Sequence, residues 1–449
     1  MSQGTEILVV RPSYIDQLKQ WQGQTDLVKI VTGVRRCGKS KLLQMFQSEL
    51  MFDKVAPESI MSLNLEDPVQ TDELGLQIAE NGFLNGYEIV LKHILNQVKD
   101  QRLYYVFIDE VQLLNNWQKL ANGLRMRGNI DVYLTGSNAY MFSSDIANSF
   151  GGRYIEIKMQ PLTFSEYFSA YHIGLGHEPK TREEFQHGRS IYDVYLAYLR
   201  ESGFPQVQQL IFRTDQQIVT DYLVDTVYRN TVQKDIIKRF NIGNDNKLDA
   251  VIRYMFDNIG RKTSLRGIER GLRAGGRMAT VPTIDTYVKG LLDSFLMYKC
   301  DQYDIKGKQI LNTEPKYYVV DAGLRAAVIG QKDADMGRIL ENVVYLELIH
   351  RGYDVSVGKI KKFVTLPDGT TERRTIEVDF VAQKPGGLVE YYQVAYTAKN
   401  PEVIAREMAP LKEIRDNHPK ILLTMDSDES NDGGIKRVNA LRWLLDMQG

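Results

Sequence analysis

Gly33-Val34-Arg35-Arg36-Cys37-Gly38-Lys39-Ser40 is the stretch of this 449-residue chain that decides the fold. It follows the apolar run Leu27–Val31, which is typical of a buried strand, and it precedes Lys41–Phe46, whose apolar residues have helical spacing. A glycine-bounded loop between a strand and a helix fits G-x-x-x-x-G-K-[ST], in which backbone N–H groups surround a polyphosphate. The sequence therefore predicts an α/β nucleotide-binding domain rather than a chance glycine turn.

The residue types in this loop suit the charge of a nucleotide. Glycine lets the backbone approach the phosphates closely, and the N-terminal end of the following helix attracts anions. Lys39 is expected to reach the terminal phosphates, and the Ser40 hydroxyl is expected to hold Mg²⁺. The predicted ATP-binding set comprises Gly33, Val34, Arg35, Arg36, Cys37, Gly38, Lys39, Ser40 and Lys41.

Composition excludes several other classes of protein. The 56 Lys and Arg residues nearly balance the 57 Asp and Glu residues, so any nucleic-acid surface must be local. Two cysteines provide neither a disulfide framework nor a metal cluster. No apolar run approaches the roughly 18 residues of a membrane helix, and the N-terminus lacks a signal peptide. We therefore expect a cytoplasmic protein of two to four domains without a membrane partner.

Two acids end a second apolar strand. Leu103–Ile108 is unbroken and apolar, as in a buried parallel strand, and Asp109 and Glu110 follow it. Asp109 is expected to position Mg²⁺, and Glu110 is expected to polarise the water that attacks the γ-phosphate. The alternative is a strand end with two solvated acids, which the phosphate-binding loop makes the weaker interpretation. A mostly helical span is expected before this strand, from Leu74 to Lys99.

Further polar residues are candidates for contacts with the nucleotide. The strand Ile130–Thr135 runs into Gly136-Ser137-Asn138, and Ser137 and Asn138 either sense the γ-phosphate or cap the next helix. Arg153 has two interpretations. It contacts phosphate, either within the chain or across a subunit boundary of a homo-oligomer, or it is an ordinary surface arginine. Arg11 likewise either stacks on a base or lies on the surface.

These motifs, in this order, resemble a large family of prokaryotic AAA-type ATPases. The likeness rests on Gly-Val-Arg-Arg-Cys-Gly-Lys-Ser, Phe-Ile-Asp-Glu-Val-Gln, Leu-Thr-Gly-Ser-Asn, Gly-Gly-Arg-Tyr and Pro-Leu-Thr-Phe-Ser-Glu-Tyr. The resemblance implies a five-stranded parallel sheet with helices on both faces, and a C-terminal domain of the restriction-endonuclease fold. We expect an α/β P-loop ATPase domain at 1–170, a helical and winged helix-turn-helix domain at 171–312, and an α/β endonuclease-like domain at 313–449.

The middle domain carries a local excess of positive charge. Two helical stretches opening at Thr263 and Val281, after a longer helix and before a hairpin around Asp304–Lys308, match a winged helix-turn-helix. The candidate DNA contacts are Arg266, Arg270, Arg273 and Arg277. The alternative is that this module serves as a lid or a protein contact.

The C-terminal part resembles the Asp…[Asp/Glu]-x-Lys core of nucleases, but it departs from that core at one position. The resemblance implies a second metal site at Glu341, Asp379 and Gln393. Ala395 stands where the motif has its lysine, so the sequence favours a nuclease-like fold with weak or absent cleavage.

The main hypothesis is a Mg²⁺-dependent ATPase in which Lys39, Asp109 and Glu110 are catalytic and Ser40 and Asp109 bind the metal. The nucleotide state would be coupled to a partner, with DNA favoured. Two alternatives stay open, a metal-dependent DNA nuclease regulated by ATP and a nucleotide-gated binding switch with negligible turnover.

Overall fold

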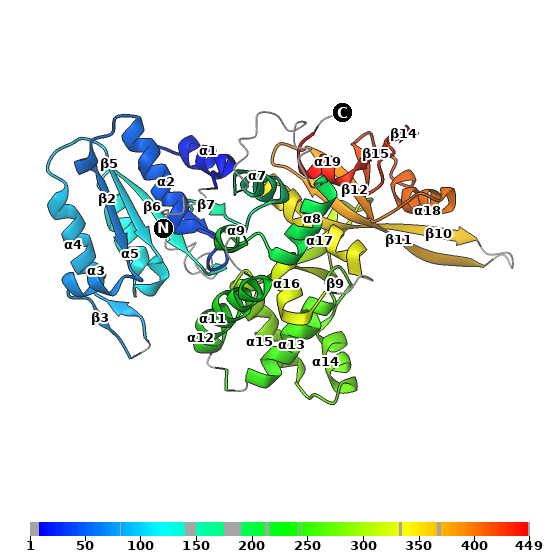
Figure 1. The fold of residues 1–449 in the computed structure, drawn as a ribbon, viewed down its shortest axis with the longest axis horizontal. Helices are drawn as coiled ribbons and strands as arrows, with labels where there is room; N and C mark the ends of the chain where they lie inside the picture. Colours follow the sequence, from blue (N-terminus) through cyan, green and yellow to red (C-terminus); the bar gives the residue numbers. More distant parts are fainter. Residues whose placement is uncertain are drawn as a thin grey trace. The chain divides into compact units, whose positions relative to one another are not determined.

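The computed structural model describes residues 9–80, 82–139, 150–174, 190–211, 215–240, 242–243, 245–331, 335–365 and 370–447. The chain forms two compact units (Figure 1). The first consists of Val9–Pro161 with Asp293–Phe295, and the second of Leu162–Leu292 with Leu296–Gly449. The predicted boundary after 170 falls inside a helix and that after 312 inside a strand. The three-domain division of the sequence stays a prediction.

The first unit is built on a parallel sheet, blue and cyan in Figure 1. In the described part of this unit five strands pair in the order β2-β5-β6-β1-β7. Their bounds are β1 (Val28–Thr32), β2 (Ile60–Asn64), β5 (Tyr104–Asp109), β6 (Ile130–Gly136) and β7 (Tyr154–Lys158). The predicted five-stranded parallel sheet is confirmed.

Helices cover both faces of this sheet because its strands are apolar on both sides. Tyr104, Val106 and Ile108 of β5 share one core with α4 (Tyr87–Gln97) and α5 (Trp117–Arg125). Phe107 faces the other way, and Phe46 of α2 (Lys39–Phe52) packs against it with ring centroids 6.2 Å apart. Helix α1 (Pro12–Gln20) lies beside α2. Every residue of β1 and β6 is buried, as expected for central parallel strands.

The span Leu74–Lys99 is less helical than predicted. Helix α3 (Pro68–Glu73) ends before it, and a small hairpin of β3 (Gln77–Ile78) and β4 (Leu84–Asn85) precedes α4. Gly86 ends this hairpin at φ +114°, a conformation that favours glycine. The prediction was wrong over Leu74–Gly86 because it overlooked Gly75, Gly82 and Gly86 as turn residues.

The second unit begins with helices. Helices α7 (Phe164–Gly174), α8 (Ile191–Glu201) and α9 (Pro205–Leu210) come first. Residues 175–189 and 212–214 of the predicted helical domain lie outside the described residues. A continuous helix follows, consisting of α10 (Gln216–Asp221), a π-helical stretch Tyr222–Tyr228, α11 (Arg229–Thr231), a π-helical stretch Val232–Ile237 and α12 (Lys238–Phe240).

Three helices and a hairpin then follow one another. They are α13 (Asp245–Asp257), α14 (Leu265–Ala274), α15 (Val281–Asp293), β8 (Met297–Asp304) and β9 (Gln309–Val319). This order of elements is the one expected for a winged helix-turn-helix, which remains a prediction. The hairpin does not stand alone, because β8 also pairs with β10 of a larger sheet.

That larger sheet is mixed. Of the described strands, eight pair in the order β14-β15-β13-β12-β11-β10-β8-β9. The strands not yet given are β10 (Asp354–Thr365), β11 (Thr371–Gln383), β12 (Val389–Ala395), β13 (Lys420–Thr424), β14 (Ser430–Asp432) and β15 (Ile435–Asn439). The accompanying helices are α16 (Ala322–Ile329), α17 (Met336–His350), α18 (Pro401–Lys412) and α19 (Ala440–Leu444).

A β-bulge in β11 positions Asp379. Ser356 of β10 pairs with Val381 and Gly358 pairs with Val378, so Asp379 and Phe380 together oppose one residue. Val378 and Val381 both join the core beneath α18, whereas Phe380 contacts Tyr345 of α17 on the other face. The extra residue turns the side chain of Asp379 toward the α17 face, as bulges beside functional sites often do.

Candidate nucleotide site

The loop between β1 and α2 has a backbone that requires glycine. Gly33 adopts φ +152°, and a Cβ there would lie 2.0 Å from the backbone oxygen of Met159. Gly38, the residue before α2, adopts φ +105°. Arg36 is exposed and also has positive φ, 66°. The loop therefore turns tightly beside Met159, with three residues at positive φ, as glycine-rich phosphate-binding loops do.

Lys39 is held inside this loop. Its side chain is 3% exposed, and Nζ donates to the carbonyl oxygens of Gly33 (3.0 Å) and Val34 (3.1 Å). Nζ also lies 3.9 Å from Oε1 of Glu110. The lysine predicted to reach phosphate and the acid predicted to activate water are thus neighbours, although 71 residues separate them.

Asp109, at the end of β5, lies beside the first turn of α2. The Thr135 hydroxyl donates to Oδ1 of Asp109, and the Ser40 hydroxyl hydrogen-bonds the same carboxylate. Burial raises the pKa of Asp109, while these two hydroxyl contacts act against the rise. The two predicted metal ligands, Ser40 and Asp109, are therefore in contact.

Glu110 has a strained backbone and a fixed side chain. Its φ of 51° is in the left-handed region, and its N–H donates to Thr135 Oγ1 at 2.9 Å. Oε2 accepts hydrogen bonds from Ser137 Oγ (3.2 Å) and from Gln112. Burial acts to raise the pKa of Glu110, but the charges of Lys39 and Arg35 outweigh it and the pKa is lowered. Strain of this kind persists where the surroundings hold a residue in a functional position.

The structure brings together some predicted residues and separates others. Ser137 is buried against Glu110, and Cys37 is buried with Sγ 3.6 Å from the carbonyl oxygen of Met159. Lys41 is exposed on α2. Arg153 lies at the other end of the sheet, where its Nε is 3.7 Å from Asp26 and its carbonyl oxygen accepts from Val28 N–H. Strand β1, about 16 Å long, separates it from the loop, so the structure does not bring Arg153 together with the other predicted residues.

Arg11 differs from both interpretations of the sequence. It is 3% exposed, and its guanidinium donates to the carbonyl oxygens of Cys37 (3.3 Å) and Gln160 (2.7 Å). It therefore supports the phosphate-binding loop from behind. The sequence shows no sign of this role, because Gln160 lies 149 residues from Arg11 along the chain.

Comparisons with known proteins agree with this geometry. Residues 25–168 match a family described as an AAA domain. The chain is 32% identical over 443 residues to an uncharacterized protein of Haemophilus influenzae, covering 98% of this chain and all of the other. The chain belongs to the family of this Haemophilus protein. The first unit of the present chain carries an AAA-type P-loop ATPase domain.

Other relatives extend over most of the chain. An uncharacterized protein of Methanocaldococcus jannaschii is 26% identical over 90% of this chain and 82% of its own length. Among solved structures, the Walker-type ATPase PABY2304 of Pyrococcus abyssi is 13% identical with a TM-score of 0.48, covering 72% of this chain and 96% of the other. Residues 193–335 match a domain of unknown function, DUF8612.

In this family member the C-terminal candidates are also close in space. Glu341 of α17 and Asp379 of β11 both lie near Nζ of Lys316, a β9 residue that the sequence analysis missed. Burial and the Glu341 carboxylate raise the pKa of Asp379 to about 7. The Gln393 side chain instead accepts from the N–H of Asp379 (3.4 Å) and donates to Glu407 (3.3 Å).

The candidate DNA contacts form one exposed basic strip on and after α14. Arg266, Arg270 and Arg273 follow one another at helical spacing, and Arg277 comes after the helix. Arg273 pairs with Glu269 at 3.2 Å. Among the described residues, no carboxylate lies within 4.0 Å of the guanidinium nitrogens of the other three. We call these four residues the α14 arginine strip.

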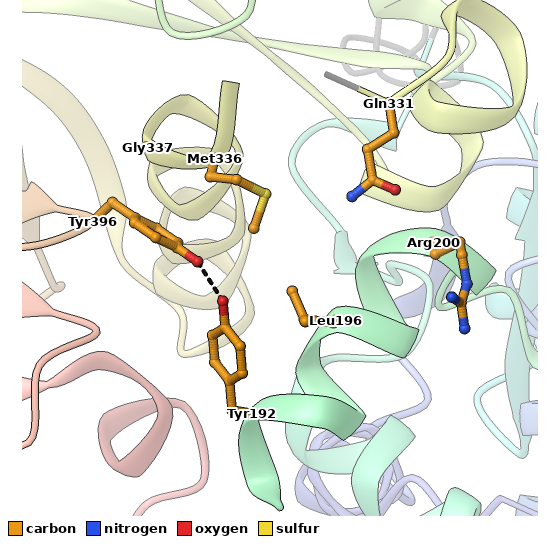
Figure 2. Close-up of a pocket in the computed structure, with 7 residues that line it drawn as sticks. All are labelled: Tyr192, Leu196, Arg200, Gln331, Met336, Gly337 and Tyr396. Atoms are coloured by element: carbon orange, nitrogen blue, oxygen red, sulfur yellow. Dashed lines mark hydrogen bonds between the residues drawn. The ribbon is translucent and has the colours of Figure 1, made fainter. Parts of the chain in front are cut away.

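A cavity of about 660 Å³ lies elsewhere in the second unit. Figure 2 shows Tyr192 (α8) and Tyr396 (after β12) pointing toward each other at one side of it. Their hydroxyls are hydrogen-bonded at 2.6 Å. Its described lining consists of Tyr192, Leu196, Arg200, Gln331, Met336, Gly337 and Tyr396. This set includes one cation and no carboxylate, so the lining does not suit a divalent metal.

Among the described residues, no helix is both long and apolar enough to span a membrane.

Proposed function

We propose that the first unit binds ATP with Mg²⁺ and hydrolyses it. The observation that carries this proposal is the meeting of Lys39, Ser40, Asp109 and Glu110 at one sheet edge. The donors fit Mg²⁺, because the Ser40 hydroxyl and the Asp109 carboxylate are oxygen ligands in contact with each other. When bound, Mg²⁺ would neutralise charge on the phosphate oxygens.

Each side chain then has a distinct role. Lys39 leaves the carbonyl oxygens of Gly33 and Val34 and binds the terminal phosphates. Glu110, kept ionised by Lys39 and Arg35, accepts a proton from the attacking water. Ser137 and Gln112 hold Glu110 until the nucleotide arrives. The role of Ser137 toward the γ-phosphate stays a prediction.

Phosphate release and nucleotide affinity of two variants test this function. Lys39→Ala is expected to lose ATP affinity, because it removes the cation that binds the terminal phosphates. Glu110→Gln is expected to keep ATP affinity and to lose at least about 100-fold in kcat, since the carboxylate acts only on the water.

Exposed substitutions of the same type provide the controls. Lys92→Ala on α4 and Glu58→Gln before β2 lie on the surface, and both are expected to behave as wild type. Wild-type turnover in both Lys39→Ala and Glu110→Gln would refute the assignment. Tight ATP binding without phosphate release in the wild type would instead select a nucleotide-gated switch.

A second proposal concerns the partner. We infer that the α14 arginine strip binds the phosphates of DNA and so couples DNA to the nucleotide state. The supporting observation is an exposed strip of arginines with one acid nearby, Glu269. The alternative is a lid or a protein contact, for which such a charge excess is not required.

DNA affinity at two salt concentrations tests this second proposal. Arg266→Ala/Arg270→Ala is expected to weaken duplex binding and to lower its salt dependence by about two ion equivalents. A control pair on α18 and beyond, Arg406→Ala/Arg415→Ala, removes the same charge from another exposed surface. The same loss of DNA affinity in both double variants would contradict a specific role of the α14 arginine strip. Unchanged DNA affinity in Arg266→Ala/Arg270→Ala would refute the proposal.

We further propose a cytoplasmic location, a homo-oligomer with an Arg153 contact across subunits, and an endonuclease-like fold for the last domain.

A further inference from the structure

The acidic cluster of the second unit surrounds a lysine. Nζ of Lys316 lies 2.8 Å from Glu341 Oε1, 2.9 Å from Glu377 Oε1 and 3.6 Å from Asp379 Oδ1. The Lys316 side chain is 5% exposed. Helix α17 and strand β11 provide the carboxylates, and β9 provides the lysine. One ammonium group in reach of three carboxylates stands where a cation would bind.

Most carboxylate oxygens of the cluster have a further donor within the protein. Oε1 of Glu341 also accepts from the Tyr318 hydroxyl at 2.7 Å. Oδ2 of Asp379 accepts from the backbone N–H of Val394 at 2.9 Å. Oε2 of Glu377 contacts Lys359 and, at 2.9 Å, Lys262. A divalent cation needs several oxygen ligands, and these oxygens already have donors.

The third ligand implied by the nuclease resemblance is not available either. Gln393 uses its carbonyl oxygen on the Asp379 N–H and its amide on Glu407. Among the described residues, no group of three or more His, Cys, Asp or Glu side chains is arranged to hold a metal ion. The residues therefore do not fit the Mg²⁺ of a nuclease core.

Charge counting gives the same answer. Within the described ranges, the ion pairs of this cluster join three lysines (Lys262, Lys316 and Lys359) to three carboxylates (Glu341, Glu377 and Asp379). The cluster is neutral when all six groups are ionised. A dication added to it would leave uncompensated positive charge in a largely buried site, which is strongly unfavourable.

We propose that Lys316 takes the place of the divalent cation in a nuclease-like carboxylate cluster, so that Lys316 and a metal ion exclude each other. The cluster instead joins the β8–β9 hairpin, and Lys262 ahead of α14, to α17 and β11. This inference is independent of ATP hydrolysis.

Mn²⁺ binding to the nucleotide-free full chain, counted by electron paramagnetic resonance, tests the proposal. Wild type and Asp379→Asn are expected to bind equal amounts of Mn²⁺. Lys316→Met keeps most of the length of the side chain without its charge, and it is expected to bind one further Mn²⁺ per chain. Lys316→Met/Asp379→Asn is expected to lose that ion. Any Mn²⁺ bound at Ser40 and Asp109 is present in all variants, so it does not affect the difference in bound Mn²⁺ between them.

A lysine on the same hairpin provides the control. Lys299 is 43% exposed and pairs with Asp301, so Lys299→Met is expected to bind Mn²⁺ as wild type does. Asp379-dependent Mn²⁺ binding in the wild type would overturn the proposal, as would a folded Lys316→Met that binds no further ion. If Lys316→Met does not fold, the comparison of wild type with Asp379→Asn decides alone.

Discussion

At the scale of single residues, the Thr135 hydroxyl connects the two acids of the nucleotide site. It donates to Asp109 and accepts from the N–H of Glu110. Thr135→Val is expected to leave that buried N–H unpaired, at about 1–3 kcal/mol of stability, and to lower kcat more than ATP affinity. Steady-state kinetics and urea unfolding check this. Thr135→Ser keeps the hydroxyl, and a similar loss in both variants would contradict the hydroxyl's role.

Glu377 predicts a pH dependence of stability. Burial opposes ionisation, but Lys316, Lys359 and Lys262 lower its pKa from 4.5 to about 2. The ionised group therefore stabilises the folded state above about pH 4.5, and this contribution is lost as the pH falls toward 2. Glu377→Gln is expected to be less stable at pH 7 by about 1–3 kcal/mol, with the difference shrinking below pH 4.5.

Urea unfolding at several pH values measures this difference. The control Glu372→Gln removes an exposed acid paired with Arg374 on the same strand, and its effect is expected to be small at every pH. A Glu377→Gln difference that stays constant down to pH 2 would contradict the lowered pKa.

Single residues also show where sequence reasoning stops. Lys39, Asp109 and Glu110 were predictable because a loop motif and two strand ends must meet at one edge of a parallel sheet. Arg11 and Lys316 were not, because each binds groups far along the chain and neither belongs to a periodic pattern. The resemblance to a nuclease concerned the lysine that is absent at position 395. In the structure a different lysine, Lys316 of β9, contacts the same acids.

At the scale of elements, strands of the first unit were predicted well. In an α/β chain, a short continuous apolar run between turn residues usually forms a buried strand. The helical prediction failed at Leu74–Gly86, where three glycines with positive φ make turns and a hairpin. Pairing of β8 with β10 depends on contacts between residues about 55 apart, which local sequence does not encode.

The packing of α14 on α13 gives a prediction at this scale. A Cβ on Gly271 would lie 2.2 Å from the ring of Tyr254, so the two helices can approach only with glycine there. Gly271→Ala is expected to cost about 1–3 kcal/mol in urea unfolding. Gly275, at the end of the same helix, has its nearest such contact at an ordinary 3.5 Å, so Gly275→Ala is the control. Equal stability of the two variants would contradict this packing.

At the scale of the whole molecule, two compact units predict two unfolding transitions. Only the first unit carries the proposed ATP site. Because ligand binding stabilises the state that binds it, MgATP at 100 times its Kd should add about 2.7 kcal/mol to that unit. Scanning calorimetry of the full chain can use a nonhydrolysable ATP analogue in place of ATP. The temperature of one transition is expected to rise, and that of the other is expected to stay the same.

Variants assign the transitions to the units. Lys39→Ala should abolish the nucleotide-induced shift, because the cation of the phosphate-binding loop is gone. Gly271→Ala should lower the transition that nucleotide leaves unmoved, because α13 and α14 belong to the second unit. If the full chain instead showed a single transition that nucleotide moves, the two units would unfold as one cooperative body. Coupling of ATP to the α14 arginine strip would then require no separate conformational step, because nucleotide binding would stabilise the strip directly.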